Sequence, residues 1–354
     1  MSLAADQLQI AAVGVVVASA CALVGSFLLL RRMAMLGDAI SHAVLPGIVV
    51  AFLISGSRSA PIMLLGAASV GLITVGLIGA LQRSRRVSDD AAIGVVFPLL
   101  FALGVVLVSR YAGKVHLDLD CILHGEIAFA ALDQLVIGGT LLGPRALWIG
   151  GVVLALDVLL VTLLFKELKL TSFDPALAAA LGFSPLLVQQ LLLGAVSFTV
   201  VGSFEAVGAI LVVAMLVVPP ATAYLLTDRL GTMVLLSMLL AAAAALGGYA
   251  VAARYDLSIA GSMATASGAL FVLAFVLAPK HGLLGRLLGW RRSRRRLRRA
   301  IVAARLLRHG GAVSSRALAG ELGWSEAEVR EAMRIGADHV TGADATGPSH
   351  QRAR

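Results

Sequence analysis

The chain has 354 residues, of which 59% are hydrophobic and only 14% are charged. Soluble globular domains carry about 25% charged residues, so this composition excludes an ordinary soluble enzyme and indicates a membrane protein with several spans. The net charge of +9 does not indicate a nucleic-acid-binding surface, because seven arginines are concentrated in residues 291–299, where they are typical of a cytoplasmic flank.

The apolar runs predict the number of spans. A transmembrane helix needs about 20 apolar residues, and the sequence contains nine runs near that length: 8–30, 36–55, 60–82, 91–109, 147–165, 186–204, 207–226, 231–252 and 259–278. The run 186–226 is interrupted by Gly202, Glu205 and Gly208. Its two halves are the least certain spans, and eight spans are the alternative if one segment only dips into the membrane. The predicted fold class is therefore an all-α polytopic bundle of eight or nine spans.

Basic residues predict the orientation of this bundle. No Lys or Arg precedes Arg31, so the first run lacks the basic start of a signal peptide and is expected to be a retained span. With the N-terminus outside, the inner loops receive eight Lys or Arg and the outer loops five, before the basic tail is counted. The positive-inside bias then predicts an outside N-terminus and a cytosolic C-terminus.

The stretch MLGDAISHAVLPG (35–47) places two ionisable residues in an apolar run. Asp38 and His42 are four residues apart and share one helix face. Ser41 flanks them, and Pro46 has no N–H to donate to the carbonyl of residue 42, so a kink is expected there. Intramembrane ionisable groups are functional candidates by default.

A carboxylate and an imidazole suit Zn, Mn or Fe, and the lack of nearby thiolate or thioether ligands argues against Cu(I). Two ligands do not complete a metal shell, whereas a two-fold dimer would supply four. The alternative is structural: Asp38 bonds a neighbouring helix and His42 is satisfied inside the bundle.

Other polar residues are weaker candidates. Glu205 lies either on the permeation path or at the membrane interface, and Asp157 is expected to be paired inside the bundle. In the external segment KVHLDLDCILHGE, His116, Asp120 and His124 recur every four residues. They could capture metal, although a solvated face of an interfacial helix is the favoured interpretation.

The segment TSFDPALAAALGFSP (171–185) predicts a short cytosolic helix. It begins with Phe173, Asp174 and Pro175 and reaches Gly182. Asp is a good N-cap, Pro suits the first helical position, and Gly suits the residue past the end. Such a helix is either a handle for a partner or a plain connector. The chain has no G-x-x-x-x-G-K-[ST] loop, so any ATPase is expected to be a separate subunit.

Composition also predicts the domain organisation. Residues 1–285 are expected to form the transmembrane domain, 286–343 a basic linker with helix-turn-helix-like cytosolic helices, and 344–354 a disordered tail. Ser325 and Glu328 form a capping-box pattern after Gly323.

Several segments together resemble the membrane permeases of bacterial ABC importers for zinc, manganese and iron. They are MLGDAISHAVLPG (35–47), SDDAAIGVVFPLLFALGVVL (88–107), TSFDPALAAALGF (171–183), EAVGAILVVAMLVVPPATAYLLTDR (205–229) and YDLSIAGSMATASGALFVLA (255–274). The resemblance covers nearly all of residues 10–285. It implies a bundle similar to the vitamin B12-type importer permease, in the bacterial cytoplasmic (inner) membrane.

The resemblance also implies partners and roles. They are a second permease protomer, a cytosolic ABC ATPase and an extracytoplasmic metal-binding protein. Asp38 and His42 match the intramembrane ion-coordinating pair, Ser41, Pro46 and Glu205 are pathway candidates, and residues 171–183 match the loop that contacts the ATPase. The chain looks closer to the manganese/iron branch. No permanently bound cofactor, ATPase activity or nucleic-acid partner is expected.

Two other functions stay open on the sequence. The first is a proton-coupled secondary metal transporter in which Asp38 or Glu205 carries protons. The second is a membrane-anchored DNA-binding regulator. This hypothesis is based on the arginine run and the helical tail, but an anchor requires far fewer than nine spans.

Overall fold

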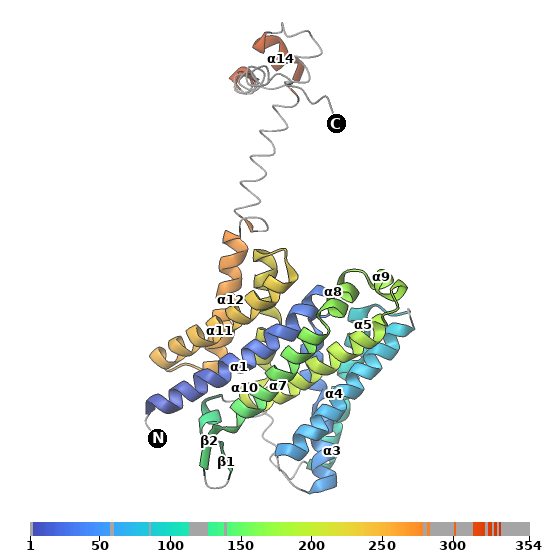
Figure 1. The fold of residues 1–354 in the computed structure, drawn as a ribbon, viewed down its shortest axis with the longest axis vertical. Helices are drawn as coiled ribbons and strands as arrows, with labels where there is room; N and C mark the ends of the chain where they lie inside the picture. Colours follow the sequence, from blue (N-terminus) through green and yellow to red (C-terminus); the bar gives the residue numbers. More distant parts are fainter. Residues whose placement is uncertain are drawn as a thin grey trace, which may run out of the picture. The chain divides into compact units, whose positions relative to one another are not determined.

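The computed structural model describes residues 3–56, 60–84, 86–112, 127–137 and 140–278, with short C-terminal pieces at 282–283, 301, 314–322, 325–327, 329–330 and 333. The chain divides into two compact units, Met1–Val276 and Leu277–Arg354. The first unit is a helical bundle (Figure 1). The expected boundaries at 285/286 and 343/344 lie outside the described residues.

The bundle is built from helices and one small hairpin. Its first half contains α1 (Leu3–Leu30), α2 (Leu36–Ala43), α3 (Leu45–Ser55), α4 (Ala60–Arg83), α5 (Asp89–Leu107) and a π-helical turn η1 (Val108–Ala112). Next come a 3-10 turn η2 (Ile127–Ala131) and the antiparallel strands β1 (Gln134–Ile137) and β2 (Thr140–Pro144). The second half contains α7 (Arg145–Leu163), α8 (Phe165–Phe173), α9 (Pro175–Ala180), α10 (Pro185–Leu226), α11 (Leu230–Tyr255) and α12 (Ile259–Leu277).

The nine predicted spans are confirmed. Within the described residues, nine helical segments are long and apolar enough to cross a membrane. The second of them, Leu36–Ser55, consists of α2 and α3, which are separated only by Val44. The predicted kink is therefore a break two residues before Pro46.

The element α10 is not one straight helix. Both halves of α10 contact the short stretch between Met33 and Gly37. The Nε2 atom of Gln189 lies 3.8 Å from the Sδ atom of Met33, and Leu216 packs against Gly37. Gln189 and Leu216 are about 27 residues apart, which corresponds to about 40 Å along a straight helix. The chain must therefore fold back between them.

The reversal occurs at Gly208, which has φ 77° and ψ 164° and is non-helical. Only glycine adopts this region readily. The run 186–226 thus forms two spans, Pro185–Phe204 and Ala206–Leu226, rather than one span and a dip.

The core of the bundle surrounds α1. This helix packs against α10, α11 and α7. The share of the span that is buried is 78% for α1 and only 17% for α12. The helix α2, which carries the candidate metal ligands, packs against α10, α5 and α4. The site is thereby held against three neighbouring helices on one side.

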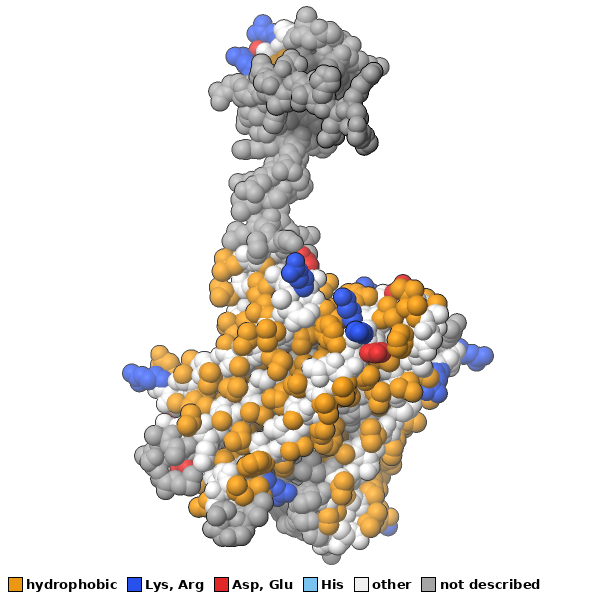
Figure 2. Space-filling model, viewed as in Figure 1, with side chains coloured by type: hydrophobic (Ala, Val, Ile, Leu, Met, Phe, Trp, Pro, Cys, Tyr) orange, Lys and Arg blue, Asp and Glu red, His pale blue; other side chains and the backbone are white. Residues whose placement is uncertain are grey.

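The surface of the bundle matches a lipid environment. On the face shown in Figure 2, hydrophobic side chains cover the middle of the bundle and the charged side chains lie toward its ends. Large apolar side chains such as Leu103, Leu159 and Leu239 are half exposed. Helix α9 and the β1–β2 hairpin lie at opposite ends of the bundle (Figure 1), which we call the α9 end and the hairpin end.

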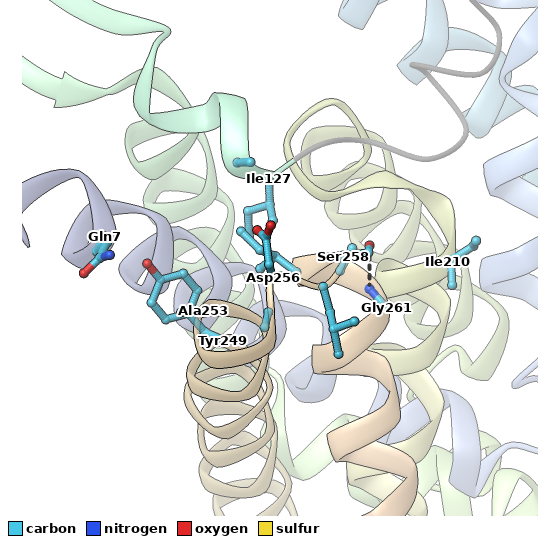
Figure 3. Close-up of a pocket in the computed structure, with 13 residues that line it drawn as sticks. Gln7, Ile127, Ile210, Tyr249, Ala253, Asp256, Ser258 and Gly261 are labelled. Atoms are coloured by element: carbon cyan, nitrogen blue, oxygen red, sulfur yellow. Dashed lines mark hydrogen bonds between the residues drawn. The ribbon is translucent and has the colours of Figure 1, made fainter. Parts of the chain in front are cut away.

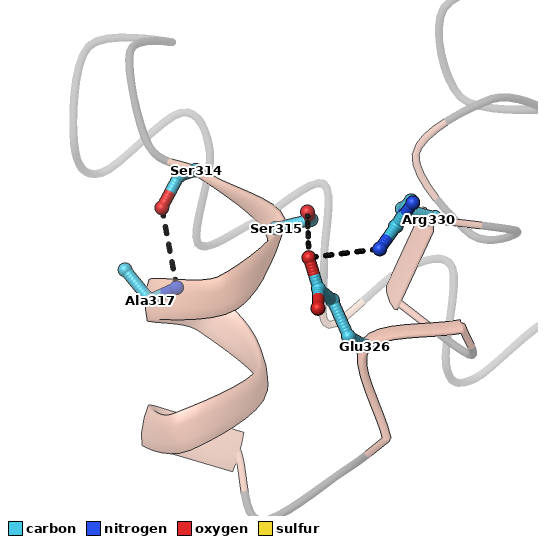
Figure 4. A network of polar contacts seen from close by, with 5 residues as sticks. All are labelled: Ser314, Ser315, Ala317, Glu326 and Arg330. Carbon is cyan, nitrogen blue, oxygen red and sulfur yellow. Dashed lines mark hydrogen bonds and ion pairs between the residues drawn. The ribbon is translucent and has the colours of Figure 1, made fainter.

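The second unit contains α14 (Ser315–Leu322). Ser314 caps this helix, since its Oγ accepts the N–H of Ala317 at 3.3 Å. The carboxylate of Glu326 accepts a hydrogen bond from Ser315 Oγ at 3.2 Å and pairs with Arg330 Nη2 at 3.0 Å (Figure 4). This polar network ties α14 to the segment that follows it.

The helix α14 ends at Leu322, directly before the expected break at Gly323. Gly323 itself lies outside the described residues. The structure describes Ser325 of the expected capping box but not Glu328. The disorder expected for 344–354 falls wholly outside them.

Candidate metal site and coupling surface

Helix α2 presents a carboxylate and an imidazole one turn apart. Asp38 Oδ1 lies 3.6 Å from His42 Nε2, and the two side chains are 41% and 30% exposed, respectively. Most of the other α2 residues are buried. The pair therefore lies on the open face of an otherwise buried helix, where both side chains can reach a ligand outside their own protomer.

The helix that carries this pair ends directly after it, at the break at Val44. Gly47 N–H bonds to the carbonyl of Val44 at 2.9 Å, three residues back, and Pro46 has no N–H to give to the carbonyl of His42. Ser41 is buried, and its Oγ donates to the Gly37 carbonyl at 2.9 Å. Pro46 is also buried. These two pathway candidates support the helix that carries the pair.

Two aromatic rings on α5 hold the imidazole. The ring of His42 lies 5.5 Å from that of Phe97 and 5.8 Å from that of Phe101, the second in an edge-on arrangement at 81°. Edge-on and tilted aromatic pairs at such separations are favourable. The imidazole thus has an apolar wall on one side and Asp38 on the other, which restricts its orientation.

Helix α9 is a well-bounded exposed element. Asp174 Oδ1 accepts the N–H of Leu177 at 2.9 Å, and Pro175 is the first helical residue. Gly182 follows the helix with φ 87°. The helix signals in 174–182 are therefore confirmed. Large apolar side chains on and beside α9 are exposed: Phe173, Leu177, Leu181 and Phe183.

Asp157 has a partner inside the bundle, as expected. Its carboxylate accepts the hydroxyl hydrogen bond of Thr199 at 2.7 Å, and it is only 2% exposed. It borders a cavity of about 420 Å³ between α4, α7 and α10, together with Gln190 and Ser197. The hydroxyl of Ser197 is buried and has no hydrogen-bond partner in the described part of the chain. This group is separate from Asp38 and His42, which do not line the cavity.

A larger cavity of about 700 Å³ lies at the hairpin end. Figure 3 shows its labelled residues, which come from α1, η2, the second span of α10, α11, α12 and the turn between α11 and α12. Its polar lining residues are Gln7, Tyr249, Asp256 and Ser258. Asp256 ends α11 in a left-handed conformation, with φ 54°.

The remaining sequence candidates have a limited structural description. Glu205 belongs to α10, three residues before the reversal, and the placement of its side chain is outside the description. The external candidates His116, Asp120 and His124 lie outside the described residues. Among the described residues, no group of three or more His, Cys, Asp or Glu gathers in one place.

Phe97, Phe101 and Arg31 were not identified from the sequence as candidate functional residues. Phe97 and Phe101 have the same four-residue spacing as Asp38 and His42, on either side of Pro98, and this repeat was the available signal. Arg31, which bonds Thr171 and Ser172 of α8, had no sequence signal because about 140 residues separate the partners.

The fold and the site together define a polytopic membrane transport protein. Residues 5–278 match the sequence model of the ABC 3 transport family. It is 49% identical, over 78% of its length and 93% of the relative, to the manganese transport system membrane protein MntD of Bacillus subtilis. It is 43% identical, over 85% and 82%, to the zinc transport system membrane protein TroD of Treponema pallidum.

One solved structure is also similar. PsaBC from Streptococcus pneumoniae, in complex with Fab, matches with a TM-score of 0.64 and 32% identity, over 77% of this chain and 92% of that one. The chain belongs to the ABC 3 transport family. It is the membrane permease of an ABC importer for manganese, zinc or iron, and the ATPase is a separate subunit.

Proposed function

We propose that this permease carries Mn²⁺ across the bacterial cytoplasmic membrane, with Asp38 and His42 as transient ligands. The observation that carries the proposal is the carboxylate–imidazole pair on the open face of α2. Manganese is supported over zinc by the relative with 49% identity, which is named for manganese transport. The donor types fit Mn²⁺, Zn²⁺ and Fe²⁺ alike.

Among the described residues, each protomer supplies two side-chain ligands at this site, Asp38 and His42. A second copy related by a two-fold axis would bring another carboxylate and imidazole to the same ion. Asp38 and His42 would then replace part of the hydration shell, while the few protein ligands keep the ion releasable. Phe97 and Phe101 position the imidazole, so that little ordering is needed when the ion arrives.

The orientation follows from the charges at the two ends. Arg31, Arg83, Lys166 and Arg229 lie at the α9 end of their spans, which the positive-inside bias assigns to the cytosol. The ATPase then contacts α9 and its exposed apolar side chains. The extracytoplasmic binding protein delivers the ion at the hairpin end, where the N-terminus lies.

In this mechanism the chain alternates between two states. The loaded binding protein releases the ion to the paired ligands of the two protomers. ATP binding and hydrolysis by the partner move α9, and the ligand face of α2 is exposed to the cytosol. No permanently bound cofactor takes part.

The test is uptake of radioactive manganese by cells that lack their own importers. The cells express this chain with its ATPase and binding protein, as wild type and as His42→Ala, at matched membrane abundance. We expect the variant to lose uptake. Unlabelled manganese should compete best, and stronger competition by zinc or iron would reassign the cargo.

Two controls separate the mechanism from proton coupling. An ATPase subunit with its phosphate-binding lysine replaced should abolish uptake in the presence of the intact permease. A proton ionophore should leave ATP-loaded vesicles active. Uptake that survives the ATPase defect and stops with the ionophore would contradict the proposal.

A further inference from the structure

Arg31 connects the end of α1 to α8. Its Nη2 donates to Thr171 Oγ1 at 2.6 Å, and its Nε donates to Ser172 Oγ at 3.2 Å. Thr171 is 4% exposed. The two hydroxyls lie in the last turn of α8, directly before Asp174 caps α9. One side chain thus binds the base of the exposed helix α9.

The hydroxyl groups are arranged to accept from a cation. Thr171 Oγ1 donates to the Glu167 carbonyl at 2.7 Å, and Ser172 Oγ donates to the Leu168 carbonyl at 2.6 Å. Their lone pairs are left for the guanidinium. Burial lowers the pKa of Arg31, but a guanidinium stays charged at any physiological pH.

Arg31 has no carboxylate partner among the described residues. Removing one partner from a buried ion pair leaves an uncompensated charge, which is very costly. Hydrogen bonds from a cation to neutral hydroxyls are weaker than such a pair. The contact between α1 and α8 therefore depends on the two hydroxyl groups of Thr171 and Ser172.

The link from Arg31 to α2 is short and rigid. α1 ends in a Schellman arrangement, with Met33 N–H bonded to Leu28 O at 2.9 Å and Arg32 N–H to Leu29 O at 3.0 Å. Arg32 has φ 60°. Leu36 N–H then bonds to Met33 O at 3.0 Å. No flexible loop intervenes.

Two further contacts hold the start of α2. Met33 is buried and lies 3.8 Å, at its Sδ, from Gln189 Nε2. Gly37 is in contact with the side chain of Leu216. The residues between α1 and α2 therefore connect Arg31 to the start of α2, and with it to Asp38, where α2 contacts α10.

We propose that Arg31 is a positioning residue that couples movement of α8 and α9 to the metal-ligand helix α2. The proposal rests on the proposed function, because it takes α9 as the ATPase contact. Arg31 does not touch the ion. It acts through Thr171 and Ser172 on one side and through the rigid turn to α2 on the other.

The experiment uses the permease reconstituted in liposomes with its ATPase and binding protein. Manganese uptake and ATP hydrolysis are measured together for wild type, Arg31→Ala, Arg31→Lys and the double variant Thr171→Val/Ser172→Ala. The matched control is Arg32→Asn, which removes an adjacent exposed arginine, and Asn tolerates the left-handed conformation. Because the double variant retains the size of both side chains closely, it tests the contact if Arg31→Ala fails to fold.

We expect Arg31→Ala and the double variant to lower maximal uptake about tenfold, the effect of losing a hydrogen bond to a charged group, with the KM for manganese unchanged. The manganese imported per ATP should fall by a similar factor. Arg31→Lys should recover part of the loss, and combining Arg31→Ala with the double variant should add little. The control should behave as wild type.

The proposal is overturned if the ratio of manganese to ATP is unchanged in Arg31→Ala or in the double variant. A raised KM with intact coupling would also overturn it, because that result describes a residue supporting the ion site alone. The proposed function fails separately, when wild-type liposomes do not import manganese or do not require ATP.

Discussion

Gly47 of α3 and Gly66 of α4 lie backbone against backbone. A Cβ atom on either glycine would collide with the carbonyl oxygen of the other. Small residues allow such close helix contacts in membranes, where packing rather than burial from water drives association. Because α3 follows α2 after the break at Val44, this contact also anchors the chain directly after the helix that carries Asp38 and His42.

Gly47→Ala should therefore destabilise the bundle. Backbone atoms cannot move aside as a flexible side chain can, and overpacking costs about 1–3 kcal/mol. The thermal midpoint of the purified protein in detergent measures the effect. Gly76→Ala is the matched control on α4, because the space around Gly76 is open. Equal midpoints for the two variants would contradict the close contact.

Phe97→Ala should weaken manganese transport without abolishing it. The substitution frees one side of the His42 ring, and an aromatic pair is worth about 0.5–1.5 kcal/mol. The KM for uptake should rise about two- to tenfold. Phe275→Ala, which breaks a ring pair 6.1 Å apart on α12, is the control and should leave KM unchanged. A lower maximal rate with normal KM would argue against positioning of the imidazole.

Thr199→Val should be more harmful than Asp157→Asn. Valine leaves the buried Asp157 carboxylate without the Thr199 hydrogen bond, and an unsatisfied buried group costs about 1–3 kcal/mol. Asparagine retains an acceptor oxygen for Thr199. Unfolding in detergent would measure both variants and the double variant. Strictly additive effects would show that the two side chains are not coupled.

Leu177→Ser should weaken assembly with the ATPase while the permease remains folded. Leu177 is 47% exposed on α9, so its loss removes apolar contact area from the proposed interface and little from the bundle. Co-purification of the ATPase with the permease measures the effect. Leu257→Ser is the control, because Leu257 is similarly exposed at the hairpin end. Normal assembly of the α9 variant would move the interface elsewhere.

Gly208→Ala should destabilise the reversal in α10. The φ of 77° and ψ of 164° belong to a region that costs about 1–3 kcal/mol for other residues. The variant should show a lower thermal midpoint and less protein in the membrane. Gly194→Ala is the control within α10, since a Cβ there would make only an ordinary contact. An unchanged midpoint for Gly208→Ala would mean that the reversal tolerates a side chain.

Much of the fold was predictable because the bilayer imposes a length on every span. The apolar runs gave the nine spans to within a few residues, and the four-residue spacing gave the shared face of Asp38 and His42. The cap at Asp174 is likewise local, since it depends on residues three positions apart. In each case the physical cause acts over less than one helix.

The contacts across the bundle were not predictable in this way. The pairs Arg31–Thr171 and His42–Phe97 depend on which helices become neighbours, and apolar spans give no pattern that specifies their partners. The reversal at Gly208 was ambiguous for a related reason. Its three interrupting residues fit a dip as well as a turn, and only the contacts of both halves with the α1–α2 region decide between them.

The reversal at Gly208 also sets how the two spans of α10 can move. No loop joins them, so the backbone at Gly208 holds their ends together at the hairpin end. Their other ends, near Ser184 and Thr227, are not joined directly to each other by the backbone. A relative movement of the two spans would therefore be smallest at Gly208 and largest at the end where α9 lies.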